Sequence, residues 1–290
     1  MKRIPAGTYL IGGSSQHGFK TDLEDQEVHV TIPEFFMSST TVTNAEFAKF
    51  IEATGYVTDA QKIGYSFVFH LLAEDQSRVD LQVQPFDWWL DVPGADWAHP
   101  FGPNSNLDGL LDHPVVHVSH NDAVAYCRWA GHRLPTEAEW EIAAKAGSLN
   151  KIFPWGDDSP GPLPSHCNTW QGQFPYQNSL DDGFLGTAPV QTYPPNDYGL
   201  YQMIGNVWEW CANPGKIDLR NFKHLDGPGF WANIQGPSNQ TFALKGGSFL
   251  CHDSYCQRYR IAARNANTAM TSASNIGFRT LKDFKKEEVG

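Results

Sequence analysis

Two cysteines near the end of the chain, Cys251 and Cys256, lie five residues apart in a polar segment and could bind a soft metal ion together. A close pair of thiolates suits Cu(I), whereas a structural zinc site needs four ligands and usually shows cysteine pairs two to four residues apart. The chain holds 5 Cys and no second close pair. The spacing by itself also allows a local disulfide or two unrelated buried thiols. The flanking residues decide between these possibilities.

The segments around this pair resemble those of a known family. The run over 246–265, with Gly-Gly-Ser before the first cysteine, and the later run over 272–279 strongly resemble the end of the formylglycine-generating enzymes, the sulfatase-modifying family. Further segments resemble the family in the same order along the chain, at 4–8, 112–119, 121–127, 131–141, 153–156 and 205–210. Several of these are shared with proteins of the same fold that do not generate formylglycine. The Cys-x4-Cys element after Gly-Gly-Ser is specific to the enzyme and therefore indicates the activity.

The resemblance implies a copper-dependent oxidase that converts a cysteine in a client protein to Cα-formylglycine, the aldehyde residue that sulfatases need, with O2 and a thiol reductant. Cys251 and Cys256 would bind Cu(I) as thiolates, and the client cysteine would join them as a third sulfur ligand. Metal coordination deprotonates a thiol, so binding would also activate the client. The implied partner is an unfolded or nascent sulfatase peptide with the motif Cys-x-Pro-x-Arg. We expect its arginine to seek a carboxylate, because acidic residues outnumber basic ones in the chain, 32 to 21.

Four more residues are implied in the active site. Ser248 and Tyr255 carry hydroxyl groups inside the cysteine motif, and we expect them to orient oxygen species. Trp208 and Asn275 match positions in the family's active-site cleft. We expect Trp208 to act in catalysis and Asn275 to bind the substrate.

Two oxygen-rich segments are implied by the resemblance as structural calcium sites, because Ca²⁺ prefers hard oxygen ligands. The first would take side-chain oxygens from Asn168 and Asp182 and main-chain oxygens from Thr169 and Phe184. The residues of this segment alone would also fit an ordinary polar loop. The second site would use Gln202, Gly205, Val207 and Glu209. Gln202 departs from the expected Asn or Asp, and its longer amide could misplace the oxygen.

Histidine and tryptophan groups have simpler explanations than metal or sugar binding. His113, His117 and His120 would suit a metal site on a helix, but the residues over 114–118 predict a strand, on which positions 113 and 117 share a face and position 120 does not. We therefore expect structural histidines. Tryptophan more often fills a core than forms a carbohydrate platform. We expect this of most of the following, with some lining a peptide groove: Trp88, Trp89, Trp97, Trp155, Trp170, Trp208 and Trp210.

The elements that must position these residues can be predicted from their start and stop signals. A capping box and apolar spacing predict a helix over 44–54 that ends at Gly55. Similar signals predict a second helix from Ser119 to a stop at Gly131, and a third over 136–146. Short strands are predicted at 28–32, 114–118 and 241–244. The family resemblance implies a C-type-lectin-like α+β fold with little regular secondary structure.

Composition limits the class of protein. The 290 residues include 26 Gly, 19 Pro and 10 Trp, which predict short elements joined by ordered loops. No repeat or linker marks a boundary, so we expect one domain over 1–290. The formal charge of -11 gives no strong basic field, so nucleic-acid binding is not expected. We expect no membrane span, because no apolar run has the required length. An odd number of cysteines without a signal peptide favours the reducing cytoplasm.

Two other functions remain open from the sequence. A non-catalytic peptide-binding module could share the fold, because a fold does not fix function. Relatives that cannot oxidise cysteine lack the cysteine pair, so its presence argues against this alternative. A thiol-disulfide exchange protein would also use Cys251 and Cys256, but without a metal. Metal dependence separates that alternative from the oxidase.

Overall fold

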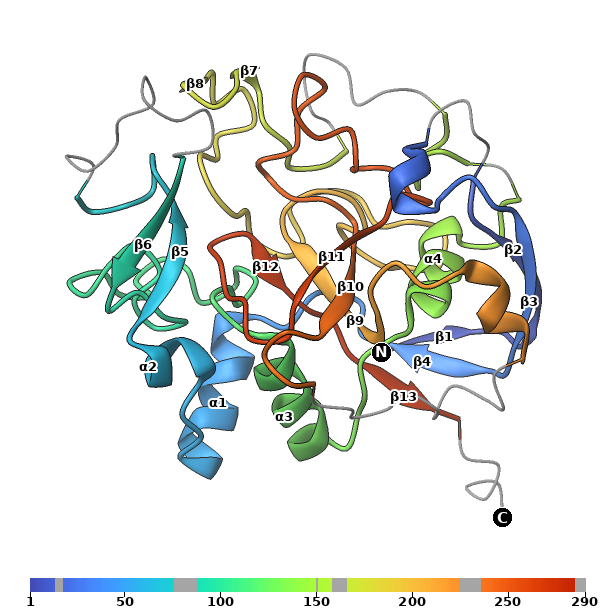
Figure 1. The fold of residues 1–290 in the computed structure, drawn as a ribbon, viewed down its shortest axis with the longest axis horizontal. Coiled ribbons are helices and arrows are strands. Elements are labelled where there is room, and N and C mark those ends of the chain that lie inside the picture. The colour runs from blue at the N-terminus through green and yellow to red at the C-terminus, as the bar shows by residue number, and fades with distance from the viewer. Residues whose placement is uncertain (14–17, 76–87, 150, 158–165, 225–235, 285–290) are drawn as a thin grey trace.

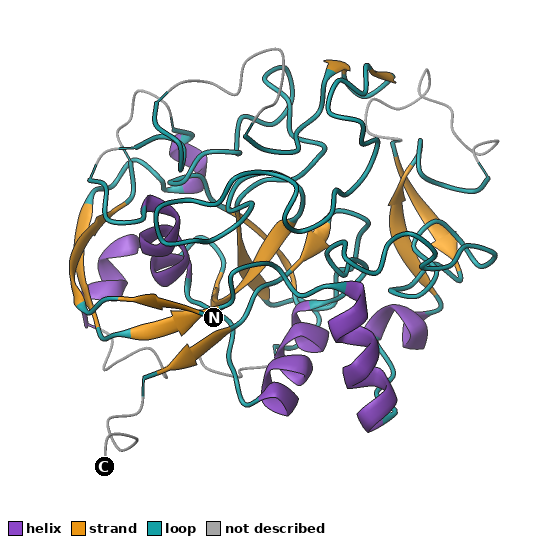
Figure 2. Ribbon diagram, turned by 180° about the vertical axis from the view of Figure 1, so that it is seen from behind, coloured by secondary structure: helices purple, strands orange, loops and turns teal. Residues whose placement is uncertain are grey.

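Loops make up most of the structure, and they connect short strands and a few helices (Figure 2). The structure is a computed structural model that describes residues 1–13, 18–75, 88–149, 151–157, 166–224 and 236–284. No helix in this described part of the chain is both long and apolar enough to cross a membrane.

A four-stranded sheet lies at the centre of the molecule (Figure 1). It contains β9 (Trp208–Pro214), β10 (Thr241–Lys245), β11 (Asn265–Thr268) and β12 (Ile276–Gly277), in the order β11-β10-β9-β12. The pairs β11-β10 and β10-β9 are antiparallel, whereas β12 runs parallel to β9 and sets Ile276 opposite Trp208. β9 is buried over its first six residues, whereas the edge strand β11 is only half-buried. The sheet therefore offers a polar edge beside a buried centre.

Smaller sheets surround the central one. β1 (Lys2–Ile4) and β13 (Leu281–Asp283) pair on either side of β4 (Phe35–Met37), so segments from the two ends of the described chain belong to one sheet. Three two-stranded ribbons are also present: β2 (Gly7–Ile11) with β3 (Val28–Ile32), β5 (Tyr65–Phe69) with β6 (Trp89–Pro93), and β7 (Gly172–Gln173) with β8 (Gln177–Asn178).

The three predicted helices are confirmed as α1 (Asn44–Thr54), α3 (His120–Ala130) and α4 (Glu137–Lys145). Each begins with a capping box, in which two backbone N–H groups at the helix start are satisfied by side chains. α1 ends at Gly55 (φ 63°) and α3 ends at Gly131 (φ 69°), a backbone conformation that favours glycine. The sequence did not predict α2 (Asp59–Ile63) or the short 3-10 helices Lys20–Asp22 and Leu219–His224.

Two of the three predicted strands are confirmed, and one is wrong. β3 occupies 28–32 with alternating burial, and β10 covers 241–244 with one further residue. The segment 114–118 forms no strand: Pro114 makes only an isolated bridge to Thr43, and His117 has a φ of 57°. The positive φ interrupts an extended backbone. In this conformation the buried imidazole of His117 forms hydrogen bonds with Ser66 Oγ at 2.8 Å and Pro100 O at 2.9 Å.

A buried ion pair joins the central sheet to its surroundings. Glu209 on β9 accepts hydrogen bonds from Arg279 Nε at 2.6 Å and Nη2 at 2.7 Å, and from Trp140 Nε1 of α4 at 2.7 Å. Arg279 follows β12 and is fully buried. The carboxylate therefore ties α4, β9 and the segment after β12 into one unit, directly next to Trp208.

Candidate active site

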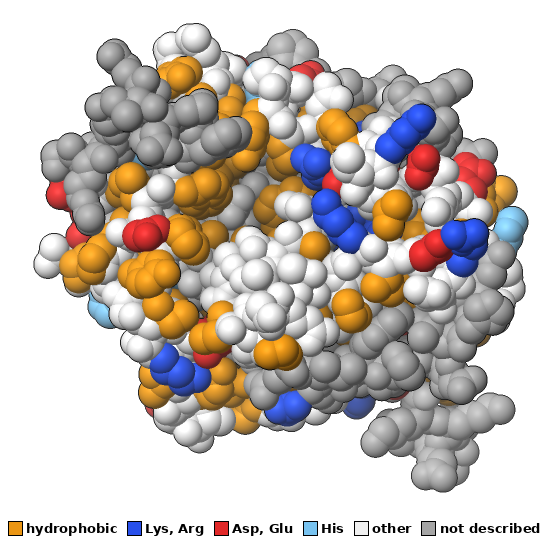
Figure 3. Space-filling model, in the orientation of Figure 1, with side chains coloured by type: hydrophobic (Ala, Val, Ile, Leu, Met, Phe, Trp, Pro, Cys, Tyr) orange, Lys and Arg blue, Asp and Glu red, His pale blue; other side chains and the backbone are white. Residues whose placement is uncertain are grey.

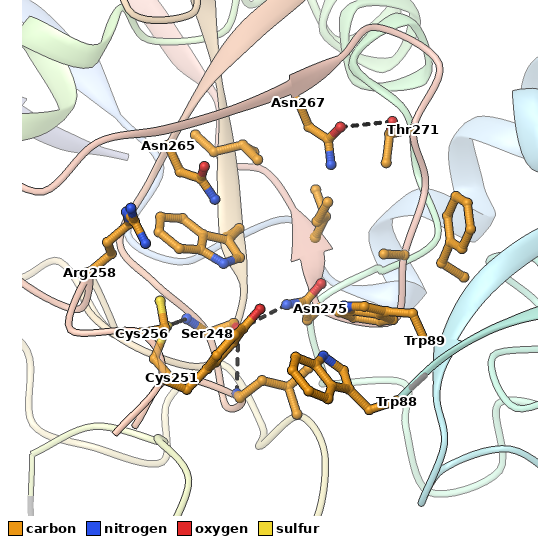
Figure 4. Close-up of a pocket in the computed structure, with 17 residues that line it drawn as sticks. Trp88, Trp89, Ser248, Cys251, Cys256, Arg258, Asn265, Asn267, Thr271 and Asn275 are labelled. Carbon is orange, nitrogen blue, oxygen red and sulfur yellow. Dashed lines mark hydrogen bonds between the residues drawn. The ribbon is translucent and has the colours of Figure 1, made fainter. Parts of the chain in front are cut away.

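A cavity of about 520 Å³ opens beside the central sheet. The face of the molecule in Figure 3 is hollowed near its centre, where hydrophobic side chains gather. Residues of the β5–β6 ribbon, the central sheet and the segment after β10 line the cavity (Figure 4). All six residues predicted for catalysis or substrate binding are among them: Trp208, Ser248, Cys251, Tyr255, Cys256 and Asn275.

The two cysteines meet at the wall of this cavity. Their Sγ atoms lie 3.1 Å apart, both side chains are buried, and both thiols are free. The backbone N–H of Ser248 donates to Cys251 Sγ at 3.4 Å. The turn between the cysteines is closed by the N–H of Cys256, which donates to His252 O at 2.7 Å. The predicted pair is thus a preformed pair of soft ligands that faces a cavity.

Two glycines shape the backbone that leads into the cysteine motif. Gly246 and Gly247 have φ values of 96° and 75°, which side-chain-bearing residues rarely adopt. A Cβ at Gly246 would lie 2.9 Å from Met203 O, and a Cβ at Gly247 would lie 3.0 Å from the Cα of Tyr259. The two glycines are therefore required by their backbone conformation and by the close packing around them.

The two thiols differ in acidity. Burial raises the pKa of Cys251 well above its usual value, and the hydrogen bond to Cys256 acts in the same direction. The pKa of Cys256 is lowered to about 7, first by the hydrogen bond from Cys251 and then by Arg258, although burial opposes the shift. Cys256 is therefore the thiol that ionises first.

The other predicted residues form a connected wall. Ser248 Oγ accepts hydrogen bonds from Leu250 N at 3.3 Å and from Asn275 Nδ2 at 3.0 Å. The backbone N–H of Trp208 donates to Asn275 O at 2.9 Å. The ring of Tyr255 makes an edge contact with Trp88 at 5.1 Å between centroids, and Trp88 and Trp89 also line the cavity. The expected peptide groove is therefore lined by at least three tryptophans.

Sequence reasoning missed four polar residues of the cavity: Arg258, Asn265, Asn267 and Thr271. Arg258 lies in the cysteine motif, but its partners are distant in sequence, since Nε donates to Asp22 Oδ2 at 2.5 Å and the guanidinium lies 4.5 Å from the Phe19 ring centroid. Asn265 and Asn267 lie two positions apart on β11, a spacing that puts them on one face of a strand. That spacing was the available signal. Without the strand assignment it pointed to no site.

The residues predicted for the first calcium site lie in one hydrogen-bonded loop. Gln171 connects two of them, because its Nε2 donates to Thr169 O at 2.9 Å and its Oε1 accepts from Asp182 N at 3.0 Å. The Asp182 carboxylate also accepts from Tyr193 OH and Phe184 N, each at 3.0 Å. Asn168 is buried close by, and its Nδ2 donates to Gly186 O at 2.9 Å, which leaves Oδ1 as the acceptor atom of the amide. The donor set is rich in oxygen and fits Ca²⁺.

The second predicted calcium site is less complete. Gln202 is buried, its Nε2 donates to Pro189 O at 2.6 Å, and its Oε1 has no hydrogen-bond partner among the described residues. That oxygen is available to a cation. Gly205 and Val207 are buried nearby in sequence, but the Glu209 carboxylate is already engaged by Arg279 and Trp140. The side chain of Glu209 therefore does not fit a calcium ligand in this arrangement.

The three histidines of the 113–120 segment have separate protein partners. His113 pairs with Thr187 Oγ1 at 2.9 Å and His120 Nε2 with Cys211 O at 3.2 Å, while His117 binds Ser66 and Pro100 as described above. Burial lowers the pKa of His117 to about 4 and that of His120 to about 3. Their partners and burial fit the expected structural roles.

Comparisons with known proteins connect this geometry to a family. A family model described as sulfatase-modifying factor enzyme 1-like domain matches residues 1–284. The formylglycine-generating enzyme of Thermomonospora curvata is 47% identical over 285 residues, which cover 98% of this chain and 93% of the relative. That of Bos taurus is also 47% identical, over 98% of this chain and 74% of the relative.

Other similar proteins include a relative that is named as inactive and a solved structure that shares the fold. The inactive C-alpha-formylglycine-generating enzyme 2 of Bos taurus is 38% identical over 96% of this chain and 86% of its own length. The solved structure of PvdO from Pseudomonas aeruginosa has a TM-score of 0.70 at 23% identity, over 97% of this chain and 93% of that one. This likeness concerns the fold, and with the mixed helices and sheets it agrees with the expected C-type-lectin-like α+β class. From the match of the family model over nearly the whole chain, and from relatives at this identity, the chain belongs to the sulfatase-modifying factor enzyme 1-like family.

Proposed function

We propose that this chain oxidises a cysteine of a client sulfatase to Cα-formylglycine, using O2, a thiol reductant and Cu(I) held by Cys251 and Cys256. The observation that carries the proposal is the pair of free thiols 3.1 Å apart at the wall of a 520 Å³ cavity. Relatives at 47% identity are named as formylglycine-generating enzymes, whereas one at 38% is named as inactive. Family membership alone therefore does not fix the activity, and the proposal rests on the thiol pair.

The residues present suit Cu(I). Two soft sulfur ligands face each other, and the cavity beside them has room for the sulfur of a client cysteine as a third ligand. Bound Cu(I) would supply the one-electron chemistry with O2 that no side chain of the protein can perform.

The overall reaction balances with these reactants. The client cysteine loses two electrons and two protons to become a thioaldehyde, and the thiol reductant provides two more of each. Together they reduce O2 to two molecules of water. Water then hydrolyses the thioaldehyde to the aldehyde and releases hydrogen sulfide. Without the reductant, two of the four electrons that O2 accepts would be missing.

The residues of the chain bind the reactants and hold protons. Ser248 Oγ already accepts two hydrogen bonds, so its own hydrogen is left to donate to the sulfur of Cys251, a hydrogen bond that acts to lower the pKa of that thiol against the effect of burial. Burial raises the pKa of Tyr255, so its hydroxyl stays protonated as a second donor. The aromatic side chains of Trp88, Trp89 and Trp208 exclude water from the reacting sulfur.

The proposal also includes structural calcium sites and a location in the cytoplasm. The loop that contains Asn168 and Asp182 would hold a structural Ca²⁺, since it offers side-chain and main-chain oxygens and Ca²⁺ has no redox role. The second site, at Gln202, would bind more weakly, because Glu209 is already paired. The chain would act in the reducing cytoplasm, which its five free thiols support.

Mass spectrometry of a Cys-x-Pro-x-Arg peptide tests this function. The peptide is incubated with protein, O2 and reductant, with and without copper, and the expected mass change is that of replacing the thiol by an aldehyde. Conversion should require copper and should be lost in Cys251→Ser and Cys256→Ser. Cys127→Ala, which removes a thiol buried in the main core, is the matched control and should remain active. Conversion at the same rate without metal would favour thiol-disulfide chemistry instead.

A further inference from the structure

The cavity wall formed by β11 is polar but carries no negative charge. Among the described residues that line the cavity there is no Asp or Glu, and Arg258 is the charged one. The expectation that a client arginine meets a carboxylate here therefore has no support from this wall. The groups that the wall does offer are neutral amides, at Asn265 and Asn267 (Figure 4).

The amide of Asn267 has a fixed orientation. Its Oδ1 accepts a hydrogen bond from the backbone N–H of Thr268 at 2.9 Å and from Thr271 Oγ1 at 3.0 Å. A backbone N–H can only donate, so the atom that it meets must be the oxygen and not the nitrogen. Thr271 Oγ1 also lies 2.6 Å from Thr268 Oγ1, so Thr268 can donate its hydroxyl hydrogen to Thr271, which donates its own to Asn267. The oxygen is thus held by two donors.

The nitrogen of the same amide faces the cavity. Among the described residues no acceptor binds Asn267 Nδ2, and Figure 4 shows the oxygen turned toward Thr271 and the nitrogen turned away from it. Because the oxygen is already occupied, Asn267 offers the cavity two N–H donors and no free acceptor. It cannot bind a guanidinium or an ammonium group, which are themselves donors only. Its ligand must present an acceptor oxygen.

We propose that Asn267 binds a main-chain carbonyl oxygen of the client peptide, so that this wall recognises the backbone of the client and not a side chain. The proposal rests on the proposed function, which makes an extended peptide the occupant of the cavity. An extended peptide presents one carbonyl per residue, and β11 is an edge strand along which such a segment can lie. Thr271 is a positioning residue, because its hydroxyl donates to the amide oxygen and so helps to fix the orientation of the amide.

Binding of a peptide that cannot react tests the proposal directly. The client cysteine is replaced by serine, and fluorescence anisotropy measures the Kd for wild type and variants. Asn267→Ala should weaken binding about 3- to 10-fold, the usual effect of one lost hydrogen bond. Asn267→Asp should weaken it further, because an acceptor then faces the carbonyl. Asn221→Asp, which adds the same charge at an exposed position of a 3-10 helix outside the cavity, is the matched control and should bind as wild type.

Two further series separate positioning from direct binding. Thr271→Val should weaken binding by less than Asn267→Ala, since Thr268 N–H still holds the amide, and Thr271→Ser should restore it. Peptides with one backbone amide replaced by an ester have a weaker carbonyl acceptor at that position. One ester position should weaken binding to wild type but not weaken binding to Asn267→Ala any further, because the two changes remove the same hydrogen bond.

The outcomes separate this proposal from the proposed function. Equal affinity of wild type and Asn267→Asp, at unchanged melting temperature, would overturn the carbonyl contact. So would ester effects that add fully to Asn267→Ala at every position. If wild type binds the serine peptide with the expected pattern but never converts the cysteine peptide, the oxidase function fails and the backbone contact stands. If wild type neither binds the serine peptide nor converts the cysteine peptide, both fail.

Discussion

Ser248 links the thiol pair to the substrate side of the cavity. Its backbone N–H donates to Cys251 Sγ, while its hydroxyl oxygen accepts from Leu250 N and Asn275 Nδ2. Because those two donors occupy the oxygen, the hydroxyl hydrogen remains to be donated to the sulfur of Cys251. Ser248 can therefore hold a proton beside the reacting sulfur. This geometry supports a catalytic role for Ser248 more strongly than its place in the cysteine motif did.

Replacing Ser248 with alanine should affect catalysis more than binding. We expect kcat to fall about 100-fold, the usual scale for a positioned proton donor, with a smaller change in KM. Steady-state kinetics with the client peptide measure both constants. Ser254→Ala is the control, because Ser254 is an exposed hydroxyl between the two cysteines whose partner is His252. A wild-type kcat in Ser248→Ala would remove this hydroxyl from the mechanism.

At the residue scale, the sequence predicted the site residues that lie together in one local motif. Cys251, Cys256, Ser248 and Tyr255 lie within nine residues, so their spacing and chemistry were visible directly. Asn267 could not be assigned a role in the same way. Its role depends on which atom of its amide already has hydrogen-bond partners. Those partners are set by Thr271 and by the position of Asn267 on β11.

At the element scale, the buried pair Glu209–Arg279 holds the strand that carries Trp208. Both side chains are almost completely inaccessible to solvent, and Trp140 of α4 donates to the same carboxylate. Removing one partner of a buried pair leaves an uncompensated charge, which costs far more than the net stabilisation by the pair itself. The position of β9 therefore depends on this contact.

Arg279→Met should lower the free energy of unfolding by about 3–5 kcal/mol, because it leaves Glu209 charged and unpaired in the interior. Urea denaturation followed by tryptophan fluorescence measures the change. Arg220→Met provides the comparison, because Arg220 pairs with Asp218 on the surface and its loss should have little effect. Similar effects of the two substitutions would contradict the assignment of Arg279 as a structural anchor.

A second contact at this scale joins α2 to α3. Asp122 of α3 accepts hydrogen bonds from Tyr56 OH and Asp59 N, each at 3.0 Å. Burial, and then the charge of Asp59, raise the pKa of Asp122 to about 6. α2 leads directly into β5, whose Phe67 lines the cavity. The protonation of Asp122 therefore affects an element next to the site.

This pKa predicts a specific pH dependence of stability. Between the ordinary pKa of 3.8 and the raised value of about 6, the folded protein binds more protons at Asp122 than the unfolded chain does. Stability due to this group is therefore present at low pH and falls as pH rises through that window, by roughly 2–3 kcal/mol. The fall should be absent in Asp122→Asn and retained in Asp108→Asn, an exposed control. Chemical denaturation at several pH values measures the difference between the variants, and parallel curves for wild type and Asp122→Asn would contradict it.

The elements that the sequence missed are those with weak local signals. α2 has a capping box at Thr58 and Gln61, but its five residues are too few to show apolar periodicity. The segment 114–118 has the apolar composition of a strand, yet His117 takes a positive φ and binds Ser66 of β5 and Pro100 of a loop. Tertiary contacts thus overrode composition in a buried segment, which a single sequence cannot reveal.

At the scale of the whole molecule, stability must come from many short elements and their loops. The four helices and the strands cover less of the described chain than the loops do, and β1 and β13 bring segments from both ends of the described chain to the same sheet. The fold class could be inferred from the family resemblance, whereas composition alone only allowed it. A bound ion in a loop would add to such a fold, because a ligand that binds the native state alone stabilises it.

Calcium removal should lower the melting temperature of the wild type. We expect a chelator to have this effect, and we expect Asp182→Asn to lack it, because the variant loses a charged ligand of the first site. Asp181→Asn is the control, since Asp181 is the exposed neighbour and pairs with Ser179. Differential scanning calorimetry with and without chelator measures the shift. An unchanged wild-type melting temperature, with no calcium found by elemental analysis, would refute the site.

The central claim is that Cys251 and Cys256 hold one Cu(I) that the reaction needs. The most direct measurement is a titration of metal-free, reduced protein with Cu(I), in which formylglycine formation is followed in the client peptide at each step. The account predicts that activity rises linearly and saturates at one equivalent of copper, and that neither Cys251→Ser nor Cys256→Ser gains activity at any copper level. Full activity before copper is added, or wild-type activity in either serine variant, would contradict it.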